Sequence, residues 1–177
     1  MRRLLTVVAL FGAARVPAAT LQQLSMDDLI AKSTAIVRGT VQSSYVAYSG
    51  PLIFTHYRIQ VVEQWKGSKG AAVDVAVPGG MVKRTRQTYA GAPQFQPGDQ
   101  YVLFLWTGKS GMTQIMGFTQ GAFQVAPDGS SDPNLTRNAS HELMLDPATH
   151  QQVTDVALTL RLSALRSQVI SALGETQ

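Results

Sequence analysis

The chain contains no cysteine among its 177 residues. This absence excludes disulfide bonds, thiolate metal ligands, a nucleophilic thiol and a cysteine-linked lipid anchor. Histidine is also scarce, with three residues, and neither a G-x-S-x-G nucleophile motif nor a phosphate-binding glycine loop occurs. Charged residues make up only 15% and hydrophobic residues 45% of the chain, a balance that excludes wholesale disorder and supports one packed domain.

The first 18 residues have the pattern of an export signal. A basic start with Arg2 and Arg3 precedes the apolar run LLTVVALFGAA, and VPAAT then supplies the small residues that a signal peptidase requires. The apolar run is about 11 residues long, whereas a membrane-spanning helix needs about 20. We therefore predict a signal peptide over 1–18, cut near Ala18, and export to the periplasm or the extracellular space. The mature domain would comprise residues 19–177.

Removal of this signal changes the charge balance. The full chain has 15 basic and 11 acidic residues and a net charge of +4. Because Arg2, Arg3 and Arg15 belong to the signal, the mature chain has a net charge of only about +1. The sequence therefore gives no support to nucleic-acid binding.

Most of the mature chain is predicted to form strands. A short helix is expected near 26–33, because Ser25 precedes Asp28 with the spacing of a capping box. The segments 35–49 and 52–65 are rich in Val, Ile, Thr and Tyr and predict two long strands joined by a tight turn. Further strands are expected at 71–77 and 100–106, followed by a hairpin of 112–118 with 121–125.

Two of these strands allow a prediction of which side chains form the core. In the second long strand Ile53, Tyr57 and Ile59 alternate on the more apolar face, which we expect to be buried. The run QYVLFLW is apolar at nearly every position, as in a strand that is buried on both faces.

The end of the chain allows two interpretations. Apolar residues alternate with Ala, Thr and Arg from Val156 to Leu162, which predicts a strand, followed by a helix capped by Ser163 that ends near Leu173. A continuous helix from about residue 149 fits the same leucines and valines as a stripe. The strict alternation favours the strand and a C-terminal helix near 163–173.

The expected fold class is mainly β with two flanking helices, an α+β arrangement. Five or six strands between the helices predict a small barrel, closed or partly open. Six pieces of the chain together resemble a module of exported bacterial proteins, some of which are joined to metalloprotease domains: AIVRGTV, VVEQWKG, VPGG, GAPQFQPGDQYVLFL, QGAFQV and LRLSALRSQVISAL. This resemblance spans nearly the whole mature chain.

More distantly, the strand–KG–strand pattern followed by PGDQYVLFL resembles the barrel of netrin-type modules and tissue inhibitors of metalloproteases. The resemblance implies an OB-like barrel that binds proteins. The inhibitors of that family chelate a protease zinc through an N-terminal cysteine. Because this chain has no cysteine, that mechanism cannot apply to any of its residues.

The segment 81–100 is predicted to be a long loop, with one irregular strand as an alternative, and carries the candidate binding residues. Lys83, Arg84 and Arg86 are the main concentration of charge outside the signal, and Tyr89 and Phe95 follow them. We predict a non-catalytic binding module whose partner is a secreted protein, such as a protease, or an acidic polymer. No cofactor, metal or catalytic residue is expected.

Phe95 also has a structural interpretation. Pro93 and Pro97 exclude a helix on either side of it and direct the chain into the strand at 100–106. Phe95 would then fill one end of the barrel. Three tyrosines elsewhere, Tyr45, Tyr48 and Tyr57, could extend a surface patch.

The alternative function is a metal-dependent or other hydrolase. His141 and Glu142 begin like a zinc-protease helix motif, but Leu145 occupies the place of the second histidine, and His150 lies farther along the chain. A second arrangement would combine His56 and Asp74 with Ser43 or Ser44 as a triad. Ordinary polar positions in loops and strands explain these residues as well.

Overall fold

The computed structural model describes residues 20–140 and 142–174. The expected signal peptide at 1–18 lies outside the described residues. Within them the fold is mainly β with two α-helices, which confirms the predicted class. Neither of these helices is both long and apolar enough to cross a membrane.

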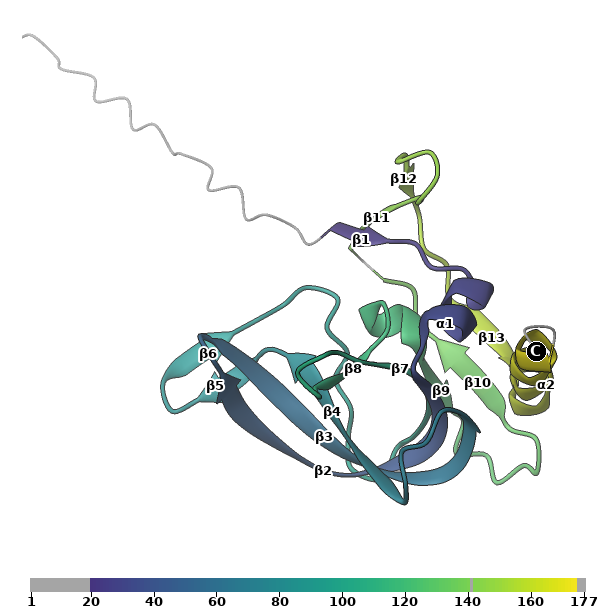
Figure 1. Ribbon diagram of the computed structural model, residues 1–177, viewed down its shortest axis with the longest axis horizontal. Coiled ribbons are helices and arrows are strands. Elements are labelled where there is room, and N and C mark those ends of the chain that lie inside the picture. The colour runs from purple at the N-terminus through teal and green to yellow at the C-terminus, as the bar shows by residue number, and fades with distance from the viewer. Residues whose placement is uncertain (1–19, 141, 175–177) are drawn as a thin grey trace, which may run out of the picture.

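The main sheet is antiparallel and contains eight strands in the order β13-β10-β9-β7-β2-β3-β4, with β8 added beside β7. Its strands are β2 (Ala35–Ser49), β3 (Leu52–Lys66), β4 (Ala72–Pro78), β7 (Gln100–Thr107), β8 (Thr113–Ile115), β9 (Ala122–Val125), β10 (Asn134–Arg137) and β13 (Leu158–Arg161). Figure 1 shows that the long strands curve strongly and wrap around an interior. Among the described strands β4 ends the order without a ladder to another edge, so the closed form of the predicted barrel does not occur.

Smaller elements flank this sheet. Helices α1 (Met26–Lys32) and α2 (Leu162–Gly174) pack together against one side, toward the right of Figure 1. A short hairpin extends from the opposite end of the molecule and consists of β5 (Gly80–Val82) and β6 (Thr85–Gln87). The prediction of a long loop over 81–100 is therefore wrong for its first part, which forms two paired strands. A third, small sheet consists of β1 (Thr20–Gln22), β11 (Leu143–Leu145) and β12 (Gln152–Val153).

The N-terminal helix forms as its sequence predicts. The Ser25 hydroxyl accepts a hydrogen bond from the Asp28 amide at 3.0 Å, and the Asp28 carboxylate accepts one from the Ser25 amide at 3.2 Å. Asp28 also lies 2.6 Å from Lys32 one turn later. These contacts satisfy amides of the first turn, and Leu29 and Ile30 are buried against the sheet.

The predicted hairpin of 112–118 with 121–125 is wrong. Strand β8 pairs with the end of β7, where Ile115 lies opposite Leu105, and β9 pairs with its beginning, where Phe123 lies opposite Val102. A 3-10 turn at Phe118–Gly121 carries the chain from one partner position to the next. The two segments therefore both pair with β7, one after the other along its length, instead of pairing with each other.

The C-terminal prediction is confirmed as a strand followed by a helix, with a different cap. Strand β13 pairs with β10, an element that the sequence did not predict. The Ser163 amide and hydroxyl each donate to the Asp132 carboxylate at 2.8 Å. A residue far away in sequence, rather than Ser163, thus receives the free donors at the start of α2.

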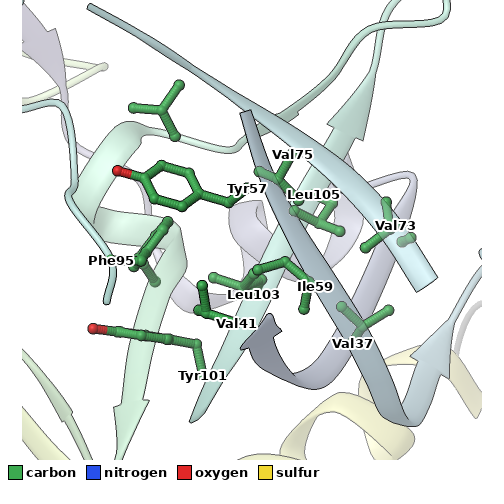
Figure 2. Packing of buried hydrophobic residues seen from close by; sticks show 13 residues of the cluster. Val37, Val41, Tyr57, Ile59, Val73, Val75, Phe95, Tyr101, Leu103 and Leu105 are labelled. Carbon is green, nitrogen blue, oxygen red and sulfur yellow. The ribbon is translucent and has the colours of Figure 1, made fainter. Parts of the chain in front are cut away.

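Strand β7 is buried on both faces, as expected, because it separates two hydrophobic cores. Tyr101, Leu103 and Leu105 point into the inner core of the curved sheet with residues of β2, β3 and β4 (Figure 2). Val102 and Phe104 point to the other side, where they pack beneath the two helices. Alternation along one strand therefore joins the sheet and the helices into a single domain.

Candidate functional site

Two hairpins pack together at one end of the molecule and form the candidate site, which we call the hairpin tip and define as residues 45–56 and 79–89. Its parts are held by hydrogen bonds. The Gln87 side chain accepts from the Ile53 amide at 2.7 Å and donates to the Pro51 carbonyl at 3.0 Å. The Gly79 amide donates to the Ile53 carbonyl at 2.8 Å. The β5–β6 hairpin is therefore fixed to the turn between β2 and β3 (Figure 1).

Gly80 allows this close contact. Its φ of 135° lies in a region that side chains disfavour, and a Cβ atom at this position would lie 2.6 Å from Cγ1 of Val46 and 2.9 Å from Oγ1 of Thr55. Only glycine permits the two hairpins to approach in this way.

The hairpin tip carries exposed positive charge without local compensation. Lys83 and Arg84 form the β5–β6 turn, with Lys83 at a φ of 54°, and Arg86 follows on β6. All three side chains are exposed, and none makes an ion pair or side-chain hydrogen bond with another described residue. The surrounding segments 39–62 and 75–98 contain no Asp or Glu. A positive potential therefore surrounds the tip.

A polar hollow of about 280 Å³ lies at the base of the β5–β6 hairpin. Arg86, Tyr89, Tyr57 and Thr55 contribute to its walls, together with backbone of the Gly79-Gly80 pair. The Thr55 hydroxyl already donates to the Gly79 carbonyl at 2.9 Å, so the donors that can face a ligand are the Arg86 guanidinium and the tyrosine hydroxyls. A guanidinium beside hydroxyl groups can bind a carboxylate, sulfate or phosphate oxygen. This hollow is the part of the tip best suited to an anionic group.

The structure brings together four of the five predicted binding residues. Lys83, Arg84 and Arg86 lie on one short hairpin, and Tyr89 borders the same hollow as Arg86. Phe95 does not join them, because it is 5% exposed and lies between Tyr57 and Tyr101 in the inner core. Figure 2 shows its ring between the two tyrosine rings. This buried position agrees with the interpretation of Phe95 as a residue that fills the interior, and not with a role in binding a partner.

Tyr45, His56 and Asp74 form a second polar cluster, at the base of the tip. The Asp74 carboxylate lies 2.6 Å from Nδ1 of His56 and accepts a hydrogen bond from the Tyr45 hydroxyl at 3.1 Å. The Tyr45 and His56 rings stack with centroids 4.7 Å apart. Burial, followed by the Asp74 carboxylate, raises the pKa of Tyr45. Each Asp74 oxygen thus has a partner.

This cluster supplies two of the three members of the triad considered from the sequence. His56 and Asp74 meet across neighbouring strands, but Ser43 pairs with Arg58 and Ser44 with Tyr57. Within the described residues, no serine side chain is hydrogen-bonded to His56. The pair orients an imidazole without placing a nucleophile beside it.

The proposed histidine–glutamate metal site is only partly described. His141 lies outside the described residues, whereas Glu142 contacts the chain near Gly91 and the His150 amide donates to the Asp146 carbonyl at 3.0 Å. The described residues contain no group of three or more acidic or histidine side chains that could hold a metal. The hydrolase alternative stays a prediction.

A larger hollow of about 600 Å³ lies between residues 21–24, the end of β4 and strand β8. Its walls are mainly apolar. The amide of Gln120 is already engaged by the Leu24 amide and the Gln22 carbonyl, and Lys32 at the rim pairs with Asp28. Lys32 is the one charged side chain among its described lining residues, and because it is already paired, the hollow offers no free charge that would orient an ionic ligand.

Neither a known family model nor a curated protein matches the chain. The hairpin tip has the most distinctive chemistry of the described surface. It combines three free cations, a polar hollow and exposed aromatic side chains on a rigid support.

Proposed function

We propose that the protein is an exported, non-catalytic binding module and that its hairpin tip binds an acidic partner. The observation that carries this proposal is the set of exposed cations on the β5–β6 hairpin, Lys83, Arg84 and Arg86, with no carboxylate in either tip segment. Charges that stabilise a fold usually face a partner within the fold, whereas these face solvent. An acidic surface would supply the missing partner charges.

The support beneath the cations favours binding over a merely solvated loop. The oxygen and the nitrogen of the Gln87 side-chain amide are hydrogen-bonded to backbone at the β2–β3 turn, and Gly80 packs against Val46. Because the hairpin is already ordered, binding would cost less conformational entropy than the ordering of a flexible loop.

We interpret the domain as a partly open, OB-like barrel, an architecture that often binds ligands through its loops. Two features support this interpretation. Strands β2, β3 and β7 curve around the inner core (Figure 1). Lys69, just before β4, donates to the hydroxyls of Thr107 at 2.5 Å and Thr113 at 3.4 Å, and so connects the β4 end of the sheet with β7 and β8.

Binding of the purified protein to dextran sulfate, a soluble polyanion, tests the proposal. The variant with Lys83→Ser, Arg84→Ser and Arg86→Ser should bind about tenfold more weakly by calorimetry, because each exposed ion pair contributes roughly 0.2–1 kcal/mol. Its thermal midpoint should stay unchanged, because none of these side chains contacts another described residue through a polar group. Added salt should weaken binding of the unaltered protein.

A second variant removes the same number of charges elsewhere, through Lys109→Ser, Arg161→Ser and Arg166→Ser, which are all exposed and distant in sequence from the tip. It controls for net charge and should bind nearly as tightly as the unaltered protein. Equal losses in both variants would mean that overall charge, and not the tip, attracts polyanions. That result would contradict the proposal.

A further inference from the structure

We infer that the acidic partner is an anionic phospholipid surface into which the hairpin tip inserts, an inference that rests on the proposed function of the tip. Cations alone would serve any polyanion. The tip also exposes apolar side chains, and these need a partner that can remove them from water.

Exposed apolar side chains are concentrated at the tip. Ten large hydrophobic residues are exposed within 20–140 and 142–174, and five of them lie in the two tip segments. These five, with their exposed fractions, are Tyr45 (53%), Val46 (37%), Tyr48 (51%), Leu52 (41%) and Met81 (61%). The others lie on several different elements. Single exposed apolar residues are ordinary, but a group on two adjoining hairpins indicates a contact surface.

The apolar side chains lie on both faces of the β2–β3 hairpin. Val46 and Tyr48 face the same side as their partners Thr55 and Ile53. Successive residues alternate, so Tyr45 lies on the opposite side. Leu52 pairs with Ser49 and shares that opposite side. A protein interface would cover one face, whereas insertion of a projecting tip into a lipid layer covers both.

The tyrosines and cations of the tip also suit the boundary between a lipid layer and water. Tyrosine prefers the boundary between apolar and aqueous phases, because its ring is apolar and its hydroxyl polar. Met81 lies opposite Arg86 on the β5–β6 hairpin, so an apolar side chain and a cation extend from the same face. Lys and Arg can keep their charges among lipid phosphates while their stems contact acyl chains. Asp74 at the base is already bonded to His56 and Tyr45.

Sedimentation with vesicles tests the inference. The purified protein should sediment with phosphatidylcholine vesicles that contain phosphatidylglycerol and remain in solution with phosphatidylcholine alone. The Lys83, Arg84 and Arg86 triple serine variant should lose on the order of 100-fold in partition coefficient, because each cation near an anionic surface contributes about fivefold.

An apolar pair of substitutions distinguishes lipid from other polyanions. Leu52→Ser with Met81→Ser should reduce vesicle binding on the order of tenfold, since two exposed apolar side chains lose their transfer into lipid. The same variant should bind dextran sulfate normally. The matched control, Val62→Ser with Ile170→Ser, removes two side chains that are 52% and 55% exposed outside the tip and should bind vesicles normally.

Two results would overturn the inference while the proposed function stands. One is binding to dextran sulfate through the three cations without binding to anionic vesicles, which would assign the tip to an acidic polymer or protein. The other is equal vesicle binding by the apolar tip variant and its control. Failure to bind either polyanion or vesicles would instead contradict the proposed function itself.

Discussion

Arg137 and Asp155 form a bidentate ion pair in the interior of the protein. Nη1 of Arg137 donates to Oδ2 of Asp155 at 3.0 Å, and Nη2 donates to Oδ1 at 2.8 Å. The two side chains are only 7% and 4% exposed. Asp155 also accepts from the Ser140 amide at 2.8 Å, and Arg137 donates to the Val156 carbonyl. The pair therefore connects the end of β10 to the segment that leads into β13.

Loss of either partner should destabilise the fold strongly. We expect Asp155→Ala to lower the free energy of unfolding by about 3–5 kcal/mol, because the Arg137 charge would remain buried without a partner. Chemical denaturation measures this loss. Lys32→Ala, which breaks the exposed pair with Asp28, provides the comparison and should cost less than about 1 kcal/mol. Similar costs for the two variants would contradict the buried role of Arg137.

The same ion pair should make stability dependent on acid. Burial by itself would raise the pKa of Asp155, but hydrogen bonds from Arg137 and Ser140 outweigh it and lower the pKa below its usual value of 3.8. A carboxyl group whose pKa is lower in the folded state stabilises the fold above its unfolded pKa, and this contribution is lost as pH falls. Chemical denaturation at several pH values should show that the free energy of unfolding falls less for Asp155→Ala than for the unaltered protein as the pH is lowered into the acidic range.

Tyr101 should limit stability at alkaline pH. Burial, followed by the neighbouring Asp99 carboxylate, raises the pKa of Tyr101 from 10.0 to about 12. Because the folded pKa exceeds the unfolded one, the neutral phenol stabilises the fold below pH 10, and this contribution disappears as pH rises toward 12. Tyr101→Phe should remove that part of the alkaline loss. Unchanged alkaline denaturation in Tyr101→Phe would show that other groups cause it.

Phe95 should affect stability without affecting the hairpin tip. Its ring packs edge-on against Tyr57 at 4.9 Å and Tyr101 at 4.6 Å between centroids. Phe95→Ala should therefore cost about 3–5 kcal/mol in unfolding free energy, and Phe95→Leu less. Binding to dextran sulfate, measured while the variant is still folded, should be nearly unchanged. Weaker binding with normal stability would return Phe95 to the binding surface.

A substitution at Gly80 should weaken binding by displacing the β5–β6 hairpin. Gly80→Ala places a methyl group against Val46 at a φ of 135°, so the β5–β6 hairpin must move or strain. We expect weaker binding to dextran sulfate although no charge is removed. Gly70→Ala is the matched control, because Gly70 also has a positive φ, 68°, but an added Cβ has nothing within 4 Å. Equal binding by both variants would show that the hairpin position is unimportant.

Local patterns by themselves determined much of the fold. The capping box at Ser25 and Asp28 acts over a single turn, so its residues predict α1 without any knowledge of distant contacts. The length of β2 and β3 follows from their β-branched and aromatic content, and the burial of both faces of β7 follows from its unbroken apolar run. The cations of the β5–β6 hairpin were also recognisable as a charge cluster.

Tertiary structure alone decided which segments meet. The pairing of β10 with β13 and the capping of α2 by Asp132 join segments that are far apart in sequence. Of the tyrosines predicted for a surface patch, Tyr45 and Tyr48 are exposed at the tip, whereas Tyr57 is buried in the inner core. The sequence does not reveal that Leu52 and Met81 belong to the same surface, because they lie on different hairpins and share no periodic pattern. The chemistry of each side chain can be recognised from the local sequence. A surface, however, forms only when the folded backbone brings separate segments together, and this depends on nonlocal packing.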